Sequence, residues 1–172
     1  MHFNLIVRCE DTEDPRERSA VYAISEAAFC RADEADLIVR LRNEGVVLLS
    51  LVAEVDQQLV GHIVFSRMSI ETRNGSVPAV ALAPVAVLPS HQRRGIGESL
   101  IRRGLDVLRS RDEQIVIVLG HPDYYPRFGF SSEAASLIES PFPPEAFMAI
   151  ELRPGALRGI RGSVRYPAAF GL

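Results

Sequence analysis

Hydrophobic and polar residues follow two different periods along the chain. In 15–29, Val21, Ile24 and Ala28 recur at the spacing of one helix face. Between Val46 and Phe65 the residues become β-rich on both sides of a polar turn at 56–58, which is typical of a hairpin. The pattern predicts strands at 3–7, 46–55, 59–65, 79–88, 114–119, 147–152 and 162–166, helices at 15–29, at 33–43 and after Gly95, and a helical turn at 123–128.

The order of these elements favours one α/β domain (mixed α+β) over residues 1–172. The run at 79–88 is almost continuously apolar, as expected for a strand buried on both faces. Pro84 interrupts it and has no N–H group, so we expect a bulge or a local break at that point. The helix after Gly95 has one apolar stripe, formed by Ile96, Leu100, Ile101, Leu105 and Leu108.

Composition narrows the classes of function. The net charge of −3 and the pI of about 5.8 argue against a nucleic-acid partner. No apolar run approaches the ~20 residues of a membrane span, and 1–10 does not resemble a signal peptide, so we expect a cytoplasmic protein. The histidines are scattered and no CxxC pair occurs, so we expect no metal site. Cys9 and Cys30 are expected to be small buried hydrophobic residues.

The segment 85–97 carries the candidate chemistry. A buried strand leads through a short loop into the start of a helix, where unpartnered N–H groups and the helix dipole favour an anion. Gly95 and Gly97 allow close approach, and Arg93 and Arg94 add positive charge. These residues predict a phosphate or diphosphate ligand. The P-loop pattern and the GxGxxG pattern are both absent, since no Lys-Ser or Lys-Thr follows and Leu100 stands at the third glycine position.

The string Gln92-Arg93-Arg94-Gly95-Ile96-Gly97 matches the [QR]-x-x-G-x-[GA] motif, and so the chain resembles the GNAT acetyltransferases. The run 82–89 is similar to the central strand of that family. Downstream, the string 124–130 (YYPRFGF) is similar to its Y-x-x-x-G-F signature. The resemblance covers most of the chain and is strongest to the bacterial YhbS-like branch. It implies a central, mixed, mostly antiparallel twisted sheet with splayed parallel strands, flanked by helices.

The resemblance also implies a cofactor and site residues. Acetyl-CoA would be the co-substrate, with no metal. Its pantetheine arm would bond to the backbone of Val85, Ala86 and Val87, and its diphosphate to the N–H groups of Gln92, Arg93, Arg94, Gly95, Ile96 and Gly97. Tyr125 would be the acid that protonates the leaving thiolate, because an unperturbed tyrosine holds its proton at neutral pH. Its neighbour Tyr124 is expected to point elsewhere.

The general base stays open. Many members of the family place a glutamate on the central strand, but 79–88 contains no carboxylate. Glu54, His62 and His121 are substitutes by position in the sequence, and a water chain or an already neutral amine would make all three unnecessary. The acids Asp33, Glu34 and Asp36 and the Pro-rich stretch 140–144 are further candidates for contact with an acceptor.

The leading hypothesis is an N-acetyltransferase acting on an amine of a small molecule or a peptide. One alternative is a non-catalytic acyl-CoA-binding module or sensor, which the missing strand glutamate favours. Another is transfer from a different acyl-CoA or onto a hydroxyl. We expect a monomer or a homodimer.

Overall fold

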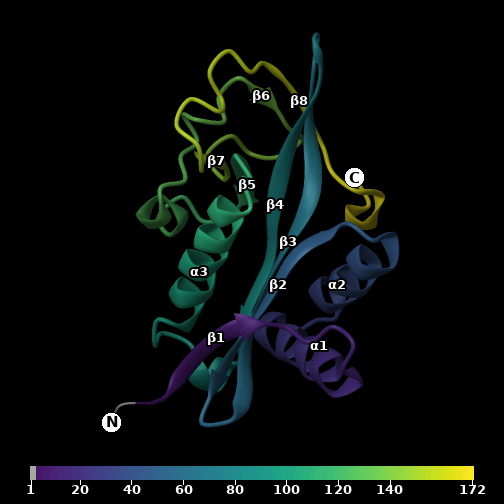
Figure 1. Ribbon diagram of the computed structural model, residues 1–172, viewed down its shortest axis with the longest axis vertical. Helices are drawn as coiled ribbons and strands as arrows, with labels where there is room; N and C mark the ends of the chain where they lie inside the picture. The colour runs from purple at the N-terminus through teal and green to yellow at the C-terminus, as the bar shows by residue number, and fades with distance from the viewer. Residues whose placement is uncertain (1–2) are drawn as a thin grey trace.

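The computed structural model describes residues 3–172, and there a long twisted sheet carries helices on both faces (Figure 1). The strands are β1 (Leu5–Cys9), β2 (Val47–Val55), β3 (Gln58–Thr72), β4 (Gly75–Val87), β5 (Ile115–Leu119), β6 (Ile138–Glu139), β7 (Phe147–Glu151) and β8 (Gly162–Arg165). The helices are α1 (Pro15–Phe29), α2 (Asp33–Glu44) and α3 (Ile96–Ser110), with short 3-10 turns η1 (Pro89–His91), η2 (Tyr125–Phe128) and η3 (Ala168–Phe170). None of the described helices is both long and apolar enough to cross a membrane.

The sheet is mixed and mostly antiparallel. Hydrogen-bonded neighbours follow the order β1-β2-β3-β4-β5-β7, and along this path only β4 and β5 are parallel. β8 pairs with the far end of β3, at Ser69–Thr72, and β6 lies parallel to β8. The fold class predicted from the sequence is therefore confirmed.

The apolar stripe of α3 determines where this helix lies. All five predicted stripe residues are buried, and they pack with Leu49, Leu51 and Phe65 of the sheet. Full burial of each such side chain contributes about 1.5–3 kcal/mol. On the opposite face, Val21 of α1 and Ile38 of α2 pack on Val52 and Val64. The sheet thus separates two apolar layers, one under α3 and one under α1 and α2 (Figure 1).

The C-terminal segment closes the second face. Ala169 joins the core beneath α2, and its C=O accepts a hydrogen bond from Arg40 Nε at 2.9 Å. The carboxylate of Glu44 accepts hydrogen bonds from the N–H groups of Ala168 and Ala169. In Figure 1 the C-terminus accordingly lies beside α2.

Two strands are longer than the sequence pattern predicts. β3 continues past Phe65 to Thr72, and β4 begins at Gly75 rather than at Ala79. The two form one long hairpin around the Asn74-Gly75 turn, and this hairpin projects beyond the rest of the sheet (Figure 1). The many polar residues in 66–72 do not follow a strand pattern, so the sequence does not predict a strand there. Pairing with β4 and β8 makes this segment part of β3.

The first helix provides a test of local stability. Asp14 is the N-cap of α1, and its Oδ1 accepts a hydrogen bond from the Arg16 N–H at 2.8 Å. We expect Asp14→Ala to lower the free energy of unfolding by about 1 kcal/mol, since an N–H donor of the first turn loses its partner. Urea denaturation measures this change. Asp14→Asn keeps an acceptor and should cost at most a few tenths of a kcal/mol; an equal loss in both variants would contradict the capping role.

Candidate functional site

β4 and β5 run side by side for a short distance and then part. Their parallel pairing begins at Val80–Val116 and ends at Leu82–Val118. β4 continues to Val87, whereas β5 ends at Leu119 and remains paired with β7. Beyond Leu82, β3 is the only strand among the described residues that pairs with β4. The side of the strand that had faced β5 is therefore open.

The strand alternation identifies the main-chain groups on this open side. The Leu88 N–H donates to the Val60 C=O at 2.8 Å, so the main-chain groups of Leu88 face β3. In an antiparallel pair these groups point to alternate sides along the strand. The groups of Ala86 therefore also face β3, while those of Val85 and Val87 face the open side. The Val87 C=O already accepts a hydrogen bond from Gln92 Nε2 at 3.0 Å.

A bulge lies at the point where the strands part. Opposite the single residue Val64 of β3, β4 has two residues, Ala83 and Pro84, and the peptide bond between them is cis. The bulge expected from Pro84 is confirmed. Because proline has no N–H group, the irregular position costs the sheet no donor.

The loop after β4 exposes a concave set of backbone donors. Arg93 and Gly95 have φ angles of 61° and 78°, in the left-handed region. Alternation of this kind turns successive N–H groups toward one side, which forms an anion-binding nest. The first hydrogen bond within α3 runs from the Ser99 N–H to the Gly95 C=O, so the N–H groups of 96–98 have no partner inside the helix. A phosphate group suits this position.

The open strand edge and the helix start lie next to each other. Val87 Cγ2 is 3.8 Å from the position that a Cβ on Gly97 would take. Arg93 and Arg94 are exposed beside the loop. The structure thus places the open edge at Val85 and Val87 next to the helix start that the sequence assigned to the diphosphate. The main-chain groups of Ala86, which the sequence also assigned to the cofactor arm, face β3 instead.

Tyr125 is held at the end of β5 by close packing. A Cβ on Gly120 would lie 2.2 Å from Cε2 of the Tyr125 ring, so only glycine leaves room for this ring. Phe130 and Tyr124 contact the ring edge to face, with centroids at 5.7 and 5.2 Å. Burial, with a smaller contribution from Tyr124, raises the pKa of Tyr125 to about 12. The hydroxyl therefore keeps its proton at neutral pH and can donate it.

The expectation for Tyr124 is wrong. Its hydroxyl lies 3.4 Å from the position of a Cβ on Gly97, so the side chain points at the start of α3. The Arg127 guanidinium lies over the Tyr124 ring at 4.7 Å from the centroid. Tyr124 therefore belongs to the site, which its place next to Tyr125 in the sequence does not indicate.

The three candidate bases lie in different surroundings. Glu54 contacts Arg8 of the edge strand β1 at 3.4 Å. His121 is exposed in the turn that follows β5. His62 is completely buried on β3, directly opposite Ala86. Of the three, His62 is the one whose strand partner is the predicted cofactor-binding segment.

The cysteines also differ from expectation. Cys9 and Cys30 are both exposed free thiols rather than buried hydrophobic residues. Cys9 ends the edge strand β1, and Cys30 is the left-handed C-cap of α1, so neither position is covered by a neighbouring element. Within residues 3–172, no group of three His, Cys, Asp or Glu side chains is arranged to hold a metal ion.

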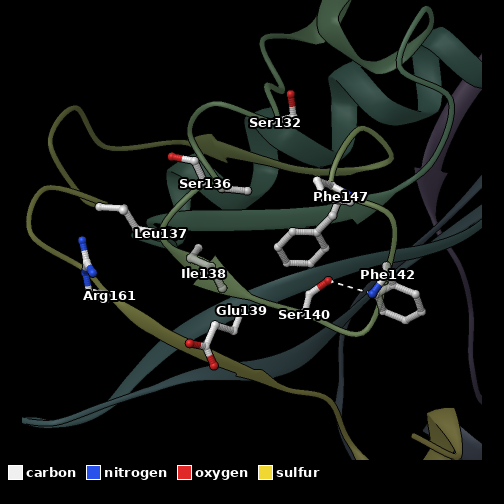
Figure 2. A pocket seen from close by; sticks show the side chains of 11 residues that line it. Ser132, Ser136, Leu137, Ile138, Glu139, Ser140, Phe142, Phe147 and Arg161 are labelled. Atoms are coloured by element: carbon white, nitrogen blue, oxygen red, sulfur yellow. Dashed lines mark hydrogen bonds between the residues drawn. The ribbon is translucent and has the colours of Figure 1, made fainter.

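The Pro-rich stretch 140–144 lines a pocket of about 390 Å³ (Figure 2). Its other walls come from the segment 132–137, from β6, from Phe147 and from Arg161. Ser140 Oγ accepts a hydrogen bond from the Phe142 N–H at 3.1 Å, which holds the turn beneath the pocket (Figure 2). Phe147 is the strand partner of Leu119, so one wall of the pocket stands at the carboxyl end of β5.

The contact between Gly120 and Tyr125 can be tested by a double-mutant cycle. Gly120→Ala should lower the free energy of unfolding by about 1–3 kcal/mol, because the new methyl group overlaps the Tyr125 ring. In a Tyr125→Ala background the same change should cost much less, since the ring is gone. Chemical denaturation of the four proteins measures both values. An equal cost in the two backgrounds would show that the ring does not occupy this space.

Comparison with known protein families identifies an acetyltransferase domain. The profile of the acetyltransferase (GNAT) domain matches residues 13–132. The uncharacterized N-acetyltransferase YhbS of Escherichia coli K12 is 32% identical over 161 residues, which span 92% of this chain and 95% of YhbS. The uncharacterized N-acetyltransferase YjhQ of the same organism is 40% identical over 119 residues, which span 68% of this chain and 66% of YjhQ.

Two solved structures resemble the whole chain. The structure of YhbS from E. coli in complex with CoA has a TM-score of 0.89 at 30% identity, and the match covers 100% of this chain and 94% of that one. A GNAT family acetyltransferase from Brucella melitensis in complex with acetyl-CoA has a TM-score of 0.80 at 33% identity and covers 98% and 99%.

Proposed function

The chain belongs to the GNAT acetyltransferase family, and on that premise we propose that it transfers the acetyl group of acetyl-CoA directly to an amine. The acceptor is an amine of a small molecule or a peptide. CoA in the YhbS structure and acetyl-CoA in the Brucella structure support the same cofactor here.

The observation that carries the proposal is the open edge of β4 beside the start of α3. A pantetheine arm contains amide groups that can pair with the edge like an added strand. In this proposal the N–H and C=O of Val85 and the N–H of Val87 make these bonds. The main chain of Ala86 bonds to β3 instead, and this pairing holds Val85 and Val87 in place on either side of it.

The diphosphate would bind to the nest and the helix start. The proposed contacts are the backbone N–H groups of Gln92, Arg93, Arg94, Gly95, Ile96 and Gly97. The macrodipole places about half a positive charge at this end of α3. The hydrogen bond from Gln92 Nε2 to the Val87 C=O ties the loop to the strand, and so holds the two halves of the cofactor site at one separation.

Acetyl transfer then requires one new bond and one broken bond. The neutral amine attacks the thioester carbonyl, the C–N bond forms, and the C–S bond breaks. Tyr125 donates its hydroxyl proton to the leaving thiolate. Its raised pKa keeps the hydroxyl protonated at neutral pH, so the proton is present when the thiolate leaves.

Binding is tested first. Gly97→Arg should abolish CoA binding, because the long side chain would fill the space in front of the helix start, where Tyr124 already lies close. Isothermal calorimetry with CoA measures the affinity, and circular dichroism checks the fold. Arg103→Ala, at an exposed position on the same helix, is the matched control and should bind normally. Normal affinity in a folded Gly97→Arg protein would show that the site is misplaced.

The two tyrosines should separate chemistry from binding. Tyr125→Phe should lower kcat by more than roughly tenfold with little change in the KM for acetyl-CoA, since it removes the proton donor. Tyr124→Phe should act mainly on that KM, since its hydroxyl faces Gly97. Steady-state kinetics of CoA release over a panel of amines measures both. Unchanged turnover in Tyr125→Phe would remove this residue from the mechanism.

The same panel decides between classes of function. CoA binding without turnover on any amine would favour a binding module or sensor over an enzyme. A series of acyl-CoA chain lengths tests whether a longer acyl group is preferred to acetyl.

A further inference from the structure

A buried polar cluster crosses the sheet on the face covered by α1 and α2. It consists of Glu10, which follows β1, Arg42 of α2, Ser50 of β2 and His62 of β3. Arg42 Nη2 lies 2.5 and 2.7 Å from the two carboxylate oxygens of Glu10. The Ser50 hydroxyl donates to Glu10 Oε2 and lies 2.7 Å from His62 Nε2. Glu10 and Ser50 also line a pocket of about 540 Å³ on the outer side of the cluster.

The hydrogen bonds of the cluster determine the tautomer of His62. Burial by itself would raise the pKa of Glu10, but hydrogen bonds from His62 and Ser50 and the charge of Arg42 outweigh it and lower the pKa to about 2. An ionised carboxylate only accepts hydrogen bonds. The single hydroxyl proton of Ser50 is therefore committed to Glu10, so Ser50 Oγ must accept from His62. His62 thus carries its proton on Nε2 and has a free lone pair on Nδ1.

His62 is held in its neutral form. Its side chain is completely buried, and burial is the largest cause that lowers its pKa. Glu10 raises this pKa and Arg42 lowers it. Other charged groups stand on the same face: Arg8 of β1, the strand partner of Val52, forms ion pairs with Glu17 of α1 and Glu54 of β2. The hydrogen bond from Arg8 lowers the pKa of Glu17 and the charge of Glu10 opposes this shift, whereas β4 contributes only the apolar Ala86 opposite His62.

The free nitrogen belongs to a layer of unpartnered polar atoms. Among the described residues, His62 Nδ1, Ser25 Oγ and Ser66 Oγ are buried and make no hydrogen bond within the chain. All three come from α1 and β3, two elements that pack on each other. Buried polar atoms are normally paired with ordered water or a ligand. The layer between α1 and β3 is therefore suited to water or to a polar atom of a ligand.

The position of His62 relates this layer to the reaction. Gly61, next to His62, faces Ile96 and Leu100 of α3, so the side chain of His62 faces the opposite layer. Its strand partner is Ala86, which lies between the two valines proposed to bind the cofactor arm. Directly opposed residues on neighbouring strands have Cβ atoms about 4.5–5.5 Å apart. A pantetheine arm that runs from the start of α3 back along β4 would pass Val85 and place its thioester at the Pro84 bulge. This bulge is two residues along β4 from Ala86, the strand partner of His62.

Resting on the proposed function, we infer that His62 Nδ1 accepts, through one bridging water, the proton that the attacking amine loses, and that Ser50 and Glu10 are the positioning residues that keep this nitrogen unprotonated. The proton leaves the amine as the C–N bond forms, and the thiolate takes a different proton from Tyr125 as the C–S bond breaks. The imidazolium that forms is stabilised by the Glu10 carboxylate 3.4 Å from Nε2. His62 then returns its proton to solvent, and solvent reprotonates Tyr125.

The tautomer is measured on the wild-type protein without any acceptor. Long-range ¹H–¹⁵N spectra of the full chain labelled at histidine, assigned with His62→Gln, should show His62 protonated on Nε2 alone at neutral pH. A titration should place its pKa below the ordinary value of 6.5. A proton on Nδ1 at neutral pH would overturn the inference while leaving acetyl transfer itself intact.

The role of the lone pair is measured by kinetics with acetyl-CoA and the best amine of the panel. His62→Gln, which keeps a donor toward Ser50, should lower kcat by roughly 10²-fold and leave the KM for acetyl-CoA nearly unchanged. The wild-type kcat should fall at acidic pH as His62 becomes protonated, and the variant should lose this fall. The ratio of the two kcat values at each pH cancels the titration of the amine itself.

Two further variants make the result specific. Arg103→Ala, at an exposed position of α3 away from the cluster, should keep wild-type kcat. Glu10→Gln removes the charge that raises the pKa of His62, so the acidic fall should move to lower pH. A wild-type kcat and pH profile in a folded His62→Gln protein would overturn the inference. Absence of turnover by the wild-type protein on every amine would instead overturn the proposed function, and the inference with it.

Discussion

The early end of pairing between β4 and β5 is the constraint on which the site depends. Had β5 followed β4 beyond Leu82, the main-chain groups of Val85 and Val87 would be satisfied within the sheet. Instead β5 stays with β7, the Gly120 N–H bonds to the Ala146 C=O, and the Tyr125 ring packs against Gly120 at the end of the strand. Each unpaired backbone group costs free energy unless a partner arrives. The fold thereby leaves unpaired main-chain groups on β4 next to the unpaired N–H groups at the start of α3.

In the proposed function, the two faces of the sheet bind different substrates. α3 covers one face, and its apolar stripe holds the helix start next to the end of β4. α1, α2 and the C-terminal segment cover the other face, where His62 and the pocket at 140–144 lie. In the proposed function, the cofactor belongs to the first face and the acceptor to the second, and they meet at the gap between the strands. The family profile matches residues 13–132, so β6, β7, β8 and every residue that lines the pocket except Ser132 lie beyond the matched segment. Loops of this kind are where acceptor choice commonly resides.

The buried cluster of Glu10, Arg42, Ser50 and His62 is costly as a structural device. Desolvating an ion pair commonly offsets most of its attraction, so an apolar core would serve stability as well. In our inference the cluster fixes the orientation of two hydrogen bonds. The Glu10 carboxylate takes the hydroxyl proton of Ser50, and Ser50 Oγ then accepts a hydrogen bond from Nε2 of His62, which determines the histidine tautomer. A polar chain of this type specifies a protonation state, which packing alone does not do.

The sequence by itself determined the features that depend on near neighbours in the chain. The apolar stripe after Gly95, the first helix at 15–29, the bulge at Pro84 and the cofactor motif are all readable there, because helix periodicity and proline geometry are local. The tertiary structure alone decided the direction of Tyr124, the extension of β3, the exposure of Cys9 and the contacts of Glu10. Ser50 lies 40 residues from Glu10 and 12 from His62, and no local pattern links them. Such contacts arise only when strand register and helix packing bring distant segments onto one face.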